Sequence, residues 1–120
     1  MARILFVDDD PYTLETLTKA VELFGHQAVL AGSGDEALRF LAGEIPDLVF
    51  IDLMLPDMDG LQVLKRLKNL PGAQQIPMYM LSAAAERDMG EQTRDAGATA
   101  YLSKPIRLQT LLDIIQKHFE

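Results

Sequence analysis

Short apolar runs and amphipathic stretches alternate along the whole chain. Five apolar runs are bounded by turn residues, at positions 4–7, 28–31, 48–51, 78–81 and 99–102. Runs of this length with such boundaries are typical of β-strands. Most of them lack a strict alternation of apolar and polar residues, which predicts strands that are covered on both faces. Such strands occur in parallel sheets.

Apolar residues between these runs recur at helical spacing. The four clear stripes are Leu14, Leu17, Val21 and Phe24; Ala37, Leu38 and Leu41; Leu61, Val63, Leu64 and Leu67; and Leu108, Leu111, Leu112, Ile115 and Phe119. Asp10 before Pro11 predicts the N-cap of the first helix, and Gly25 predicts its end. The segment 33–36 has the pattern of a capping box at the start of the second helix.

A further helix, over residues 86–96, is predicted with weaker support. Met89 and Ala96 are its only good apolar anchors, and Gly90 costs about 1 kcal/mol relative to alanine inside a helix. We therefore expect this helix to be loosely held. It is either a solvent-facing helix with a thin buried edge or a moving part of the molecule.

Strict alternation of strands and helices predicts an α/β fold in three α/β/α layers, with a doubly wound five-stranded parallel sheet. We expect one domain over residues 1–120, because the chain contains no linker, repeat or low-complexity stretch. In this class of fold the functional site lies at the carboxyl ends of the strands. The loops that follow the strands are therefore the place to search for chemistry.

Composition narrows the classes of partner. The 120 residues are 48% hydrophobic and 24% charged, with 11 Lys and Arg against 18 Asp and Glu, so the net charge is −7. This sign argues against direct binding of nucleic acid or of an anionic membrane surface. The absence of cysteine excludes disulfides and thiolate chemistry. The apolar run at 4–7 is too short for a signal peptide or membrane insertion, and we expect a cytoplasmic protein.

Three carboxylates follow two of the predicted strands. Asp8 and Asp9 come directly after the first strand, and Asp52 comes directly after the third. If these strands are neighbours, about 4.8 Å apart, the three side chains converge. Carboxylates this close repel one another unless a cation is bound. A set of oxygen ligands that leaves coordination positions open suits Mg²⁺ better than Ca²⁺.

Other polar residues have simpler interpretations. Asp10 is expected to act as a helix cap, and Asp57 and Asp59 lie among turn-forming residues after the third strand. His26 and His118 lie far from the predicted site and receive no role.

Ser82 and Lys104 follow the fourth and fifth strands and extend the candidate site. Taken separately, Ser82 could be the N-cap of the next helix and Lys104 a surface lysine. Together with the acids they describe a phosphoryl site. A carboxylate nucleophile needs no general base at pH 7, but the arriving phosphoryl group brings negative charge that a metal ion and an ammonium can offset.

These motifs resemble the receiver domain of two-component response regulators, of the single-domain chemotaxis-regulator type. The similarity covers residues 2–119. It is carried by four segments in order: Val7-Asp8-Asp9, the run from Ile51 to Gly60 around Asp52, Ser82-Ala83 and Lys104-Pro105. The resemblance implies the flavodoxin-like strand order 2-1-3-4-5.

The resemblance also implies a role for each site residue. Asp52 would accept the phosphoryl group from a phosphohistidine of a histidine kinase or a histidine phosphotransfer protein. Asp9 and Asp52 would bind Mg²⁺ directly, Asp8 more often through water, and the Met54 backbone carbonyl would complete the protein ligands. Lys104 would pair first with Asp52 and then with the phosphoryl group.

Switching in this family implies further roles. The Ser82 hydroxyl would move toward the phosphoryl group, and Tyr101 would turn inward into the released space; Tyr101 could equally be a half-buried strand residue. The fourth helix, fifth strand and fifth helix would form the output face for a downstream protein target or effector domain, and homodimerisation through this face is left open. The Lys104-Pro105 bond is a candidate cis peptide.

Two positions depart from the chemotaxis pattern, which has polar residues there. Met54 and Ala84 cannot orient an attacking water, so we expect slow loss of the phosphoryl group. The expected function is a phosphorylation-dependent signalling switch and not a turnover enzyme, limited to self-phosphorylation and slow autodephosphorylation.

Three other functions fit this sequence less well. A Mg²⁺-dependent aspartyl-phosphate phosphatase or phosphotransferase usually has an aspartate two residues after its nucleophile, where this chain has Met54. A phosphorylation-independent receiver-like interaction module would have lost the acceptor, a metal ligand or the lysine. A flavodoxin-like cofactor carrier would need glycine and hydroxyl residues, instead of three acids, after the first strand.

Overall fold

Five strands pair in parallel within the part of the chain that the structure, a computed structural model, describes, residues 1–83 and 90–119. They are β1 (Arg3–Val7), β2 (Gln27–Ala31), β3 (Leu48–Asp52), β4 (Met78–Ser82) and β5 (Ala100–Ser103). Their order across the sheet is β2-β1-β3-β4-β5. The predicted topology is therefore confirmed, and strand ends differ from the predicted ones by at most one residue.

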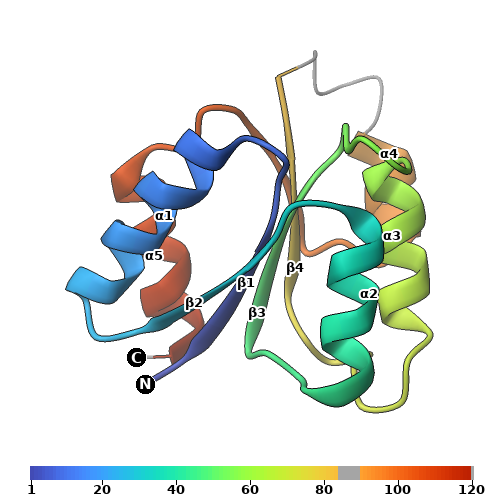
Figure 1. Cartoon of the computed structure of the whole chain (residues 1–120), viewed down its shortest axis with the longest axis horizontal. Coiled ribbons are helices and arrows are strands. Elements are labelled where there is room, and N and C mark those ends of the chain that lie inside the picture. The colour runs from blue at the N-terminus through green and yellow to red at the C-terminus, as the bar shows by residue number, and fades with distance from the viewer. Residues whose placement is uncertain (84–89, 120) are drawn as a thin grey trace.

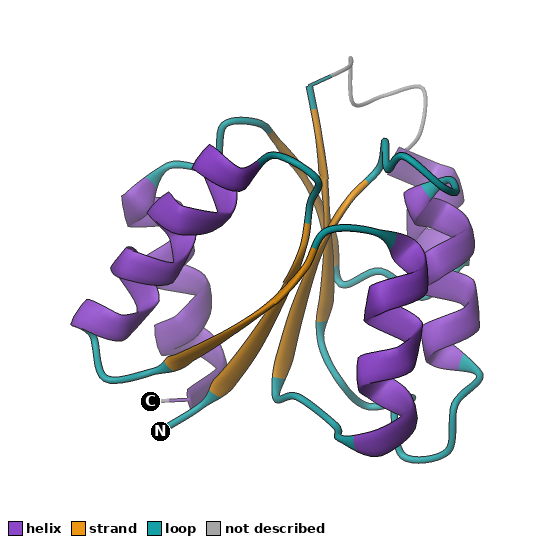
Figure 2. Ribbon diagram, in the orientation of Figure 1, coloured by secondary structure: helices purple, strands orange, loops and turns teal. Residues whose placement is uncertain are grey.

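Helices cover both faces of this sheet. They are α1 (Pro11–Leu23), α2 (Gly34–Gly43), α3 (Gly60–Lys68), α4 (Gly90–Asp95) and α5 (Leu108–Phe119). Helices α1 and α5 lie on one face, and α2, α3 and α4 lie on the other (Figure 1). Figure 2 shows the resulting three layers, helix, strand and helix, that the alternating pattern predicts. None of these helices has both the length and the apolar character needed to cross a bilayer.

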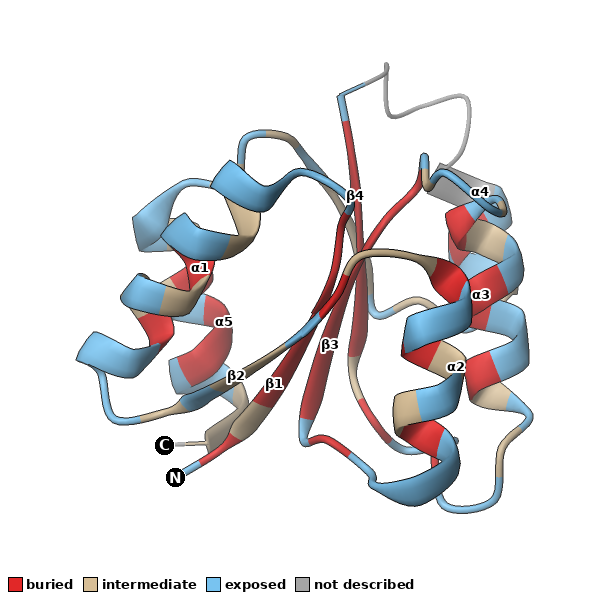
Figure 3. Ribbon diagram, viewed as in Figure 1, coloured by how far each residue is buried: buried red, intermediate tan, exposed pale blue. Residues whose placement is uncertain are grey.

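The three central strands are buried along their whole length beyond the first residue of β1 (Figure 3). Successive side chains of a strand point to opposite faces, so each apolar run contributes side chains to two cores, one on each side of the sheet. The core under α2 and α3 takes Leu5, Val7, Val49, Ile51, Met78 and Met80. The core under α1 and α5 takes Ile4, Phe6, Leu48, Phe50, Tyr79 and Leu81. This double burial explains why the runs lack a polar alternation.

The residues that the sequence predicts as helix caps and helix ends have these roles at α1 and α2. The Asp10 carboxylate accepts a hydrogen bond from the Tyr12 N–H, and Gly25 adopts a positive φ of 85° just beyond the helix end. At α2, the Ser33 hydroxyl accepts from the Glu36 N–H. The Glu36 carboxylate accepts from the Gly32 N–H, one residue before the partner that a capping box would use.

Two helices differ from the expectation. The described part of the fourth helix is α4, so Met89, one of its two expected anchors, lies outside the described residues. In this part Thr93 is buried, and Ala96 just beyond α4 packs on the core. In α5, Leu108 of the predicted stripe is 54% exposed, and Ile114 is buried instead. Leu108 is the first residue of the helix, which explains why this position of the stripe is less covered than those in the helix interior.

Both histidines make specific contacts near the amino ends of the strands. His118 of α5 forms a 2.7 Å hydrogen bond with the hydroxyl of buried Tyr79. The His26 Nδ1 accepts a hydrogen bond of 3.0 Å from the Ala2 N–H. These contacts tie the end of α5 and the loop before β2 to the sheet, which is a structural role that the sequence alone did not indicate.

Candidate functional site

Two buried carboxylates lie at the ends of neighbouring strands. Asp8 follows β1 directly, and Asp52 is the last residue of β3. Their exposed fractions are only 1% and 6%. Because β1 and β3 pair in parallel, with Val7 opposite Ile51, both side chains reach the same edge of the sheet.

Asp9 joins this pair from the solvent side. One carboxylate oxygen from each of Asp8, Asp9 and Asp52 lies within 4.8 Å of the others. The three form an incomplete shell of hard oxygen donors. Asp9 is exposed, so the cluster is open to ions from the solvent on that side. Such a donor set fits Mg²⁺, which prefers oxygen ligands and keeps several waters. In the described residues this is the one cluster of three or more side chains that could hold a metal ion.

Lys104 is brought to the two buried acids by the end of β5. Its backbone N–H donates to the Ser82 carbonyl at 2.9 Å, which holds the start of the β5–α5 loop against β4. Its ammonium donates to Asp8 Oδ2 at 2.9 Å and to Asp52 Oδ2 at 3.1 Å. One cation therefore bridges two carboxylates that belong to different strands.

The second oxygen of each buried acid accepts a hydrogen bond from the backbone two residues further on. Asp8 Oδ1 accepts from the Asp10 N–H at 3.0 Å, and Asp52 Oδ1 accepts from the Met54 N–H at 3.2 Å. Each carboxylate is therefore held at both oxygens. This double anchoring fixes the orientation of Asp8 and Asp52.

Burial and the shared lysine act in opposite directions on the charges. Burial raises the pKa of Asp52 above its ordinary value, and the Lys104 ammonium reduces the shift without removing it. Burial also works to lower the pKa of Lys104, but its hydrogen bonds to Asp8 and Asp52 prevail and the pKa is raised. Lys104 therefore stays an ammonium, while the negative charge of Asp52 is incompletely compensated.

The segment 53–59 between β3 and α3, here called the acceptor loop, is closed tightly at its base. The Leu53 N–H donates to the Leu81 carbonyl at 2.8 Å, and the Gly60 N–H donates to the Leu53 carbonyl at 2.7 Å. Met54 and Asp59 form an isolated antiparallel bridge. A Cβ at position 60 would lie 2.2 Å from the Asp52 carbonyl oxygen, so only glycine fits there.

The remaining predicted residues lie on β4, β5 and their following loops. Ser82 ends β4 and is 2% exposed. Tyr101 of β5 is half-buried against the core under α2 and α3, and its hydroxyl is buried with no hydrogen-bond partner in the part of the chain described. The Lys104-Pro105 peptide bond is cis. Met54 is 76% exposed, and Ala84 lies outside the described residues.

The three aspartates interpreted as caps or turn residues have distinct contacts. Asp10 caps α1, as expected. Asp59 caps α3 by accepting from the Leu61 N–H at 2.8 Å. Asp57 instead reaches across to α2, where its two oxygens accept from the Gly34 and Asp35 N–H groups, each at 2.9 Å. No local pattern could have indicated this contact, because its partners lie 23 and 22 positions away in the sequence.

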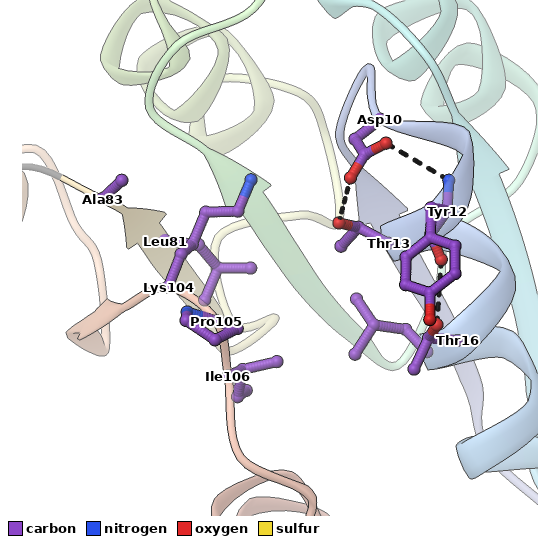
Figure 4. A pocket seen from close by; sticks show the side chains of 10 residues that line it. Asp10, Tyr12, Thr13, Thr16, Leu81, Ala83, Lys104, Pro105 and Ile106 are labelled. Carbon is purple, nitrogen blue, oxygen red and sulfur yellow. Dashed lines mark hydrogen bonds between the residues drawn. The ribbon is translucent and has the colours of Figure 1, made fainter.

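A hollow of about 390 Å³ opens beside the cluster, between the start of α1 and the β5–α5 loop. Figure 4 shows Tyr12, Thr13 and Thr16 on one side and Lys104, Pro105 and Ile106 on the other. Tyr12 is 77% exposed. The hollow joins a largely apolar surface to the charged end of Lys104.

Comparison with known proteins agrees with this geometry. The family model for the response regulator receiver domain matches residues 4–116. The chain is 40% identical over 113 residues to response regulator MprA of Mycolicibacterium vanbaalenii, a match that covers 92% of this chain and 47% of the relative. The chain therefore spans about half the length of the curated relatives it matches.

Solved structures give the same result. A CheY-like response regulator receiver domain from Methanospirillum hungatei superimposes with a TM-score of 0.91 at 30% identity, covering 98% of this chain and 92% of the other. The receiver domain of sensor histidine kinase PA1611 from Pseudomonas aeruginosa, with a magnesium ion coordinated in its active-site cleft, gives 0.88 at 26% identity, with coverages of 98% and 96%. The chain belongs to the response regulator receiver domain family of two-component systems, whose general function is phosphorylation-dependent signalling.

Proposed function

We propose that this chain is a signalling switch that accepts a phosphoryl group on Asp52 from a phosphohistidine. The donor would be a histidine kinase or a histidine phosphotransfer protein. The observation that carries this proposal is the Lys104 ammonium, which bridges the carboxylates of Asp8 and Asp52 beside exposed Asp9. This arrangement combines a nucleophile, a cation and a set of metal ligands at one edge of the sheet.

In the transfer step an Asp52 carboxylate oxygen attacks the phosphorus of the phosphohistidine. An oxygen–phosphorus bond forms, the phosphorus–nitrogen bond breaks, and the electron pair leaves with the imidazole nitrogen. The product on this chain is an acyl phosphate. No general base is needed, because the attacking oxygen carries no proton. The hydrogen bond from the Met54 N–H restrains the carboxylate during the attack.

Asp8, Asp9 and Asp52 would hold a Mg²⁺ ion, together with the backbone carbonyl of Met54. The bound ion would supply positive charge to phosphoryl oxygens during the transfer. Burial raises the pKa of Asp52 against the opposing effect of Lys104. A divalent cation beside the three carboxylates would favour the charged form of Asp52, which is the form that attacks.

Lys104 and Ser82 would act on the transferred group itself. The Lys104 ammonium contacts Asp52 before transfer and can follow the new negative charge onto a phosphoryl oxygen. Ser82, next along β4 from the residue paired with Asp52, has a hydroxyl that would donate to another of these oxygens. Both groups act by stabilising charge and neither transfers a proton.

The hollow between α1 and the β5–α5 loop offers a place for the donor. Asp10 and Lys104 line it, so a group seated there lies beside the acidic cluster. Exposed Tyr12 supplies apolar surface on the same side (Figure 4). We therefore propose that the donor approaches from this side.

The output would pass through Tyr101 to the face formed by α4, β5 and α5. The Tyr101 ring packs against the core under α2 and α3, and its hydroxyl is buried. Phosphorylation would favour an inward position of this ring by drawing Ser82 toward the phosphoryl group. A downstream protein target or effector domain, or a second copy of the chain, would read the change on this face.

The decisive experiment is intact-mass measurement after incubation with Mg²⁺ and phosphoramidate, a small donor with a phosphorus–nitrogen bond. The wild-type chain is expected to gain one phosphoryl group. Asp52→Asn is expected to gain none. Asp113→Asn, which changes an exposed acid of α5 in the same way, is the matched control and should behave as the wild type.

Absence of any mass gain in the wild type would overturn the proposal and favour a phosphorylation-independent interaction module. An equal gain in Asp52→Asn would mean that another residue is the acceptor.

A further inference from the structure

The first turn of α2 is capped by two different parts of the chain. A helix begins with N–H groups that have no partner inside the helix. The Glu36 N–H donates a hydrogen bond to the hydroxyl of Ser33, three residues earlier in the chain. The Gly34 and Asp35 N–H groups instead donate to the two carboxylate oxygens of Asp57, in the acceptor loop. These two hydrogen bonds also lower the pKa of Asp57, so the carboxylate stays charged.

Close packing supports the same contact. A Cβ added at Gly34 would lie 2.6 Å from the Cγ and Sδ atoms of Met58 and 2.8 Å from a methyl group of Val63. Met58 is next to Asp57, so the tip of the acceptor loop rests directly on the backbone of α2. Hydrogen bonding and packing thus join the same two segments.

The base of this loop carries residues of the proposed site. The loop leaves β3 at Asp52, and its base is closed by the hydrogen bond from Gly60 to Leu53 and by the bridge between Met54 and Asp59. The segment 55–58 between these closures contains the anchored tip. Only Leu55 and Pro56 separate Met54 from Asp57, so movement of the tip away from α2 would pull on the Met54 peptide across a two-residue connection.

We propose that Asp57 is a positioning residue of the acceptor site. By holding the tip of the acceptor loop on α2, it keeps the Met54 backbone carbonyl where this oxygen can serve as a ligand for Mg²⁺. The inference rests on the proposed function, because it assigns Asp57 to the metal site of the same reaction. Asp57 is not a member of the three-carboxylate cluster, and its two oxygens are occupied by the Gly34 and Asp35 N–H groups.

Coupling of this kind acts in both directions. If the contact with α2 favours the loop position that binds Mg²⁺, then Mg²⁺ must favour the contact with α2. The amide protons of Gly34 and Asp35 should therefore respond when Mg²⁺ binds, although neither residue belongs to the metal cluster. A helix cap with no connection to the site would give no such response.

The test is an amide NMR titration of the ¹⁵N-labelled, unphosphorylated chain with MgCl₂. In the wild type we expect the Gly34 and Asp35 signals to shift in step with binding. Asp57→Ala is expected to weaken Mg²⁺ binding by about 3- to 10-fold, at or below the low end of the effects seen for groups that orient metal ligands. Its Gly34 and Asp35 signals should no longer follow the titration.

Two controls separate positioning from simpler effects. Ser33→Ala removes the local cap of α2 and leaves the Asp57 contact in place. Asp59→Asn removes one negative charge from the same loop, while asparagine can still cap α3. Both are expected to bind Mg²⁺ within about twofold of the wild type. If Asp57→Ala fails to fold, Asp57→Asn, which keeps one acceptor oxygen, should show a smaller weakening in the same direction.

Wild-type affinity in the folded Asp57 variant would overturn the inference, as would an equal weakening in either control. These results do not depend on phosphorylation. A wild-type chain that gains no phosphoryl group, but whose Mg²⁺ affinity still depends on Asp57, would contradict the proposed function alone.

Discussion

The ammonium of Lys104 donates a hydrogen bond of 3.1 Å to Asp52, a residue 52 positions earlier in the chain, and one of 2.9 Å to Asp8. Exposed Asp9 lies beside these two acids, so the cluster holds three carboxylates, and the one ammonium contacts two of them. With all three carboxylates ionised, the Lys104 ammonium leaves two negative charges uncompensated. One divalent cation would neutralise them. Lys104 therefore helps to hold the site together, and we expect its removal to lower both the stability of the fold and the transfer of a phosphoryl group to Asp52.

Replacing Lys104 by methionine should destabilise the fold. The variant leaves two buried carboxylates without their cation, and breaking a fully buried ion pair costs about 3–5 kcal/mol. Because the Lys104 side chain is 21% exposed, we expect a smaller loss, about 1–3 kcal/mol in the free energy of unfolding. Urea unfolding without metal measures it. Lys65→Met, an exposed lysine of α3, is the control, and an equal loss in both variants would contradict the interpretation.

Adding Mg²⁺ should stabilise the chain, and Asp9 should determine how much. For a dissociation constant near ~1 mM, ~10 mM Mg²⁺ would add about 1.4 kcal/mol. Asp9→Asn removes one of three mutually repelling charges, so without metal we expect this variant to be as stable as the wild type or up to about 1 kcal/mol more stable. Its response to Mg²⁺ should be smaller. Urea titrations with MgCl₂ and with EDTA test this; an unchanged response would remove Asp9 from the ligand set.

The phosphoryl group should be lost slowly from Asp52. The Met54 side chain, 76% exposed beside the acceptor, cannot hydrogen-bond an attacking water. Met54→Asn supplies a group that can, and we expect it to shorten the half-life of the phosphorylated chain by up to roughly tenfold. Intact-mass time courses after removal of the donor give both half-lives. A wild-type half-life of seconds with Mg²⁺ would contradict the expectation.

Removing the Tyr101 hydroxyl should not destabilise the chain. This hydroxyl is buried and has no hydrogen-bond partner within residues 1–83 and 90–119. A buried polar group without a partner costs about 1–3 kcal/mol. Tyr101→Phe keeps the ring and removes this cost, so the free energy of unfolding should stay equal or rise by about 1 kcal/mol. A clear loss of stability in urea unfolding would mean that the hydroxyl has a partner in solution.

His118 should make the fold less stable in mild acid. Burial lowers the pKa of His118 below its ordinary value of 6.5, and nearby Lys117 acts in the same direction. Between the lowered pKa and about 6.5 the unfolded chain binds more protons than the folded one, so stability falls as the pH falls through this window. Urea unfolding at pH 7.5 and 5.5 should show a smaller difference for His118→Gln than for the wild type. Equal differences would contradict the prediction.

Most of the fold could be read from the local pattern of the chain. Apolar runs such as 48–51 predict strands buried on both faces, because alternate side chains feed two separate cores. The sequence also predicts that the polar residues after these runs lie at one edge of the sheet, because parallel strands end on the same side. Asp8, Asp9, Asp52, Ser82 and Lys104 could therefore be grouped as one candidate site before any coordinates.

Tertiary structure alone decided which of these groups touch and how the loops are held. The hydrogen bond of Lys104 to Asp8 depends on distances across four strands, β1, β3, β4 and β5, and the contact of Asp57 with α2 depends on the packing of a loop against a helix that precedes it. Neither of these two contacts is reflected in a periodic pattern of residues in the sequence. Burial patterns repeat along the chain and can be read from it, whereas a contact between two single side chains exists only once the layers have been assembled.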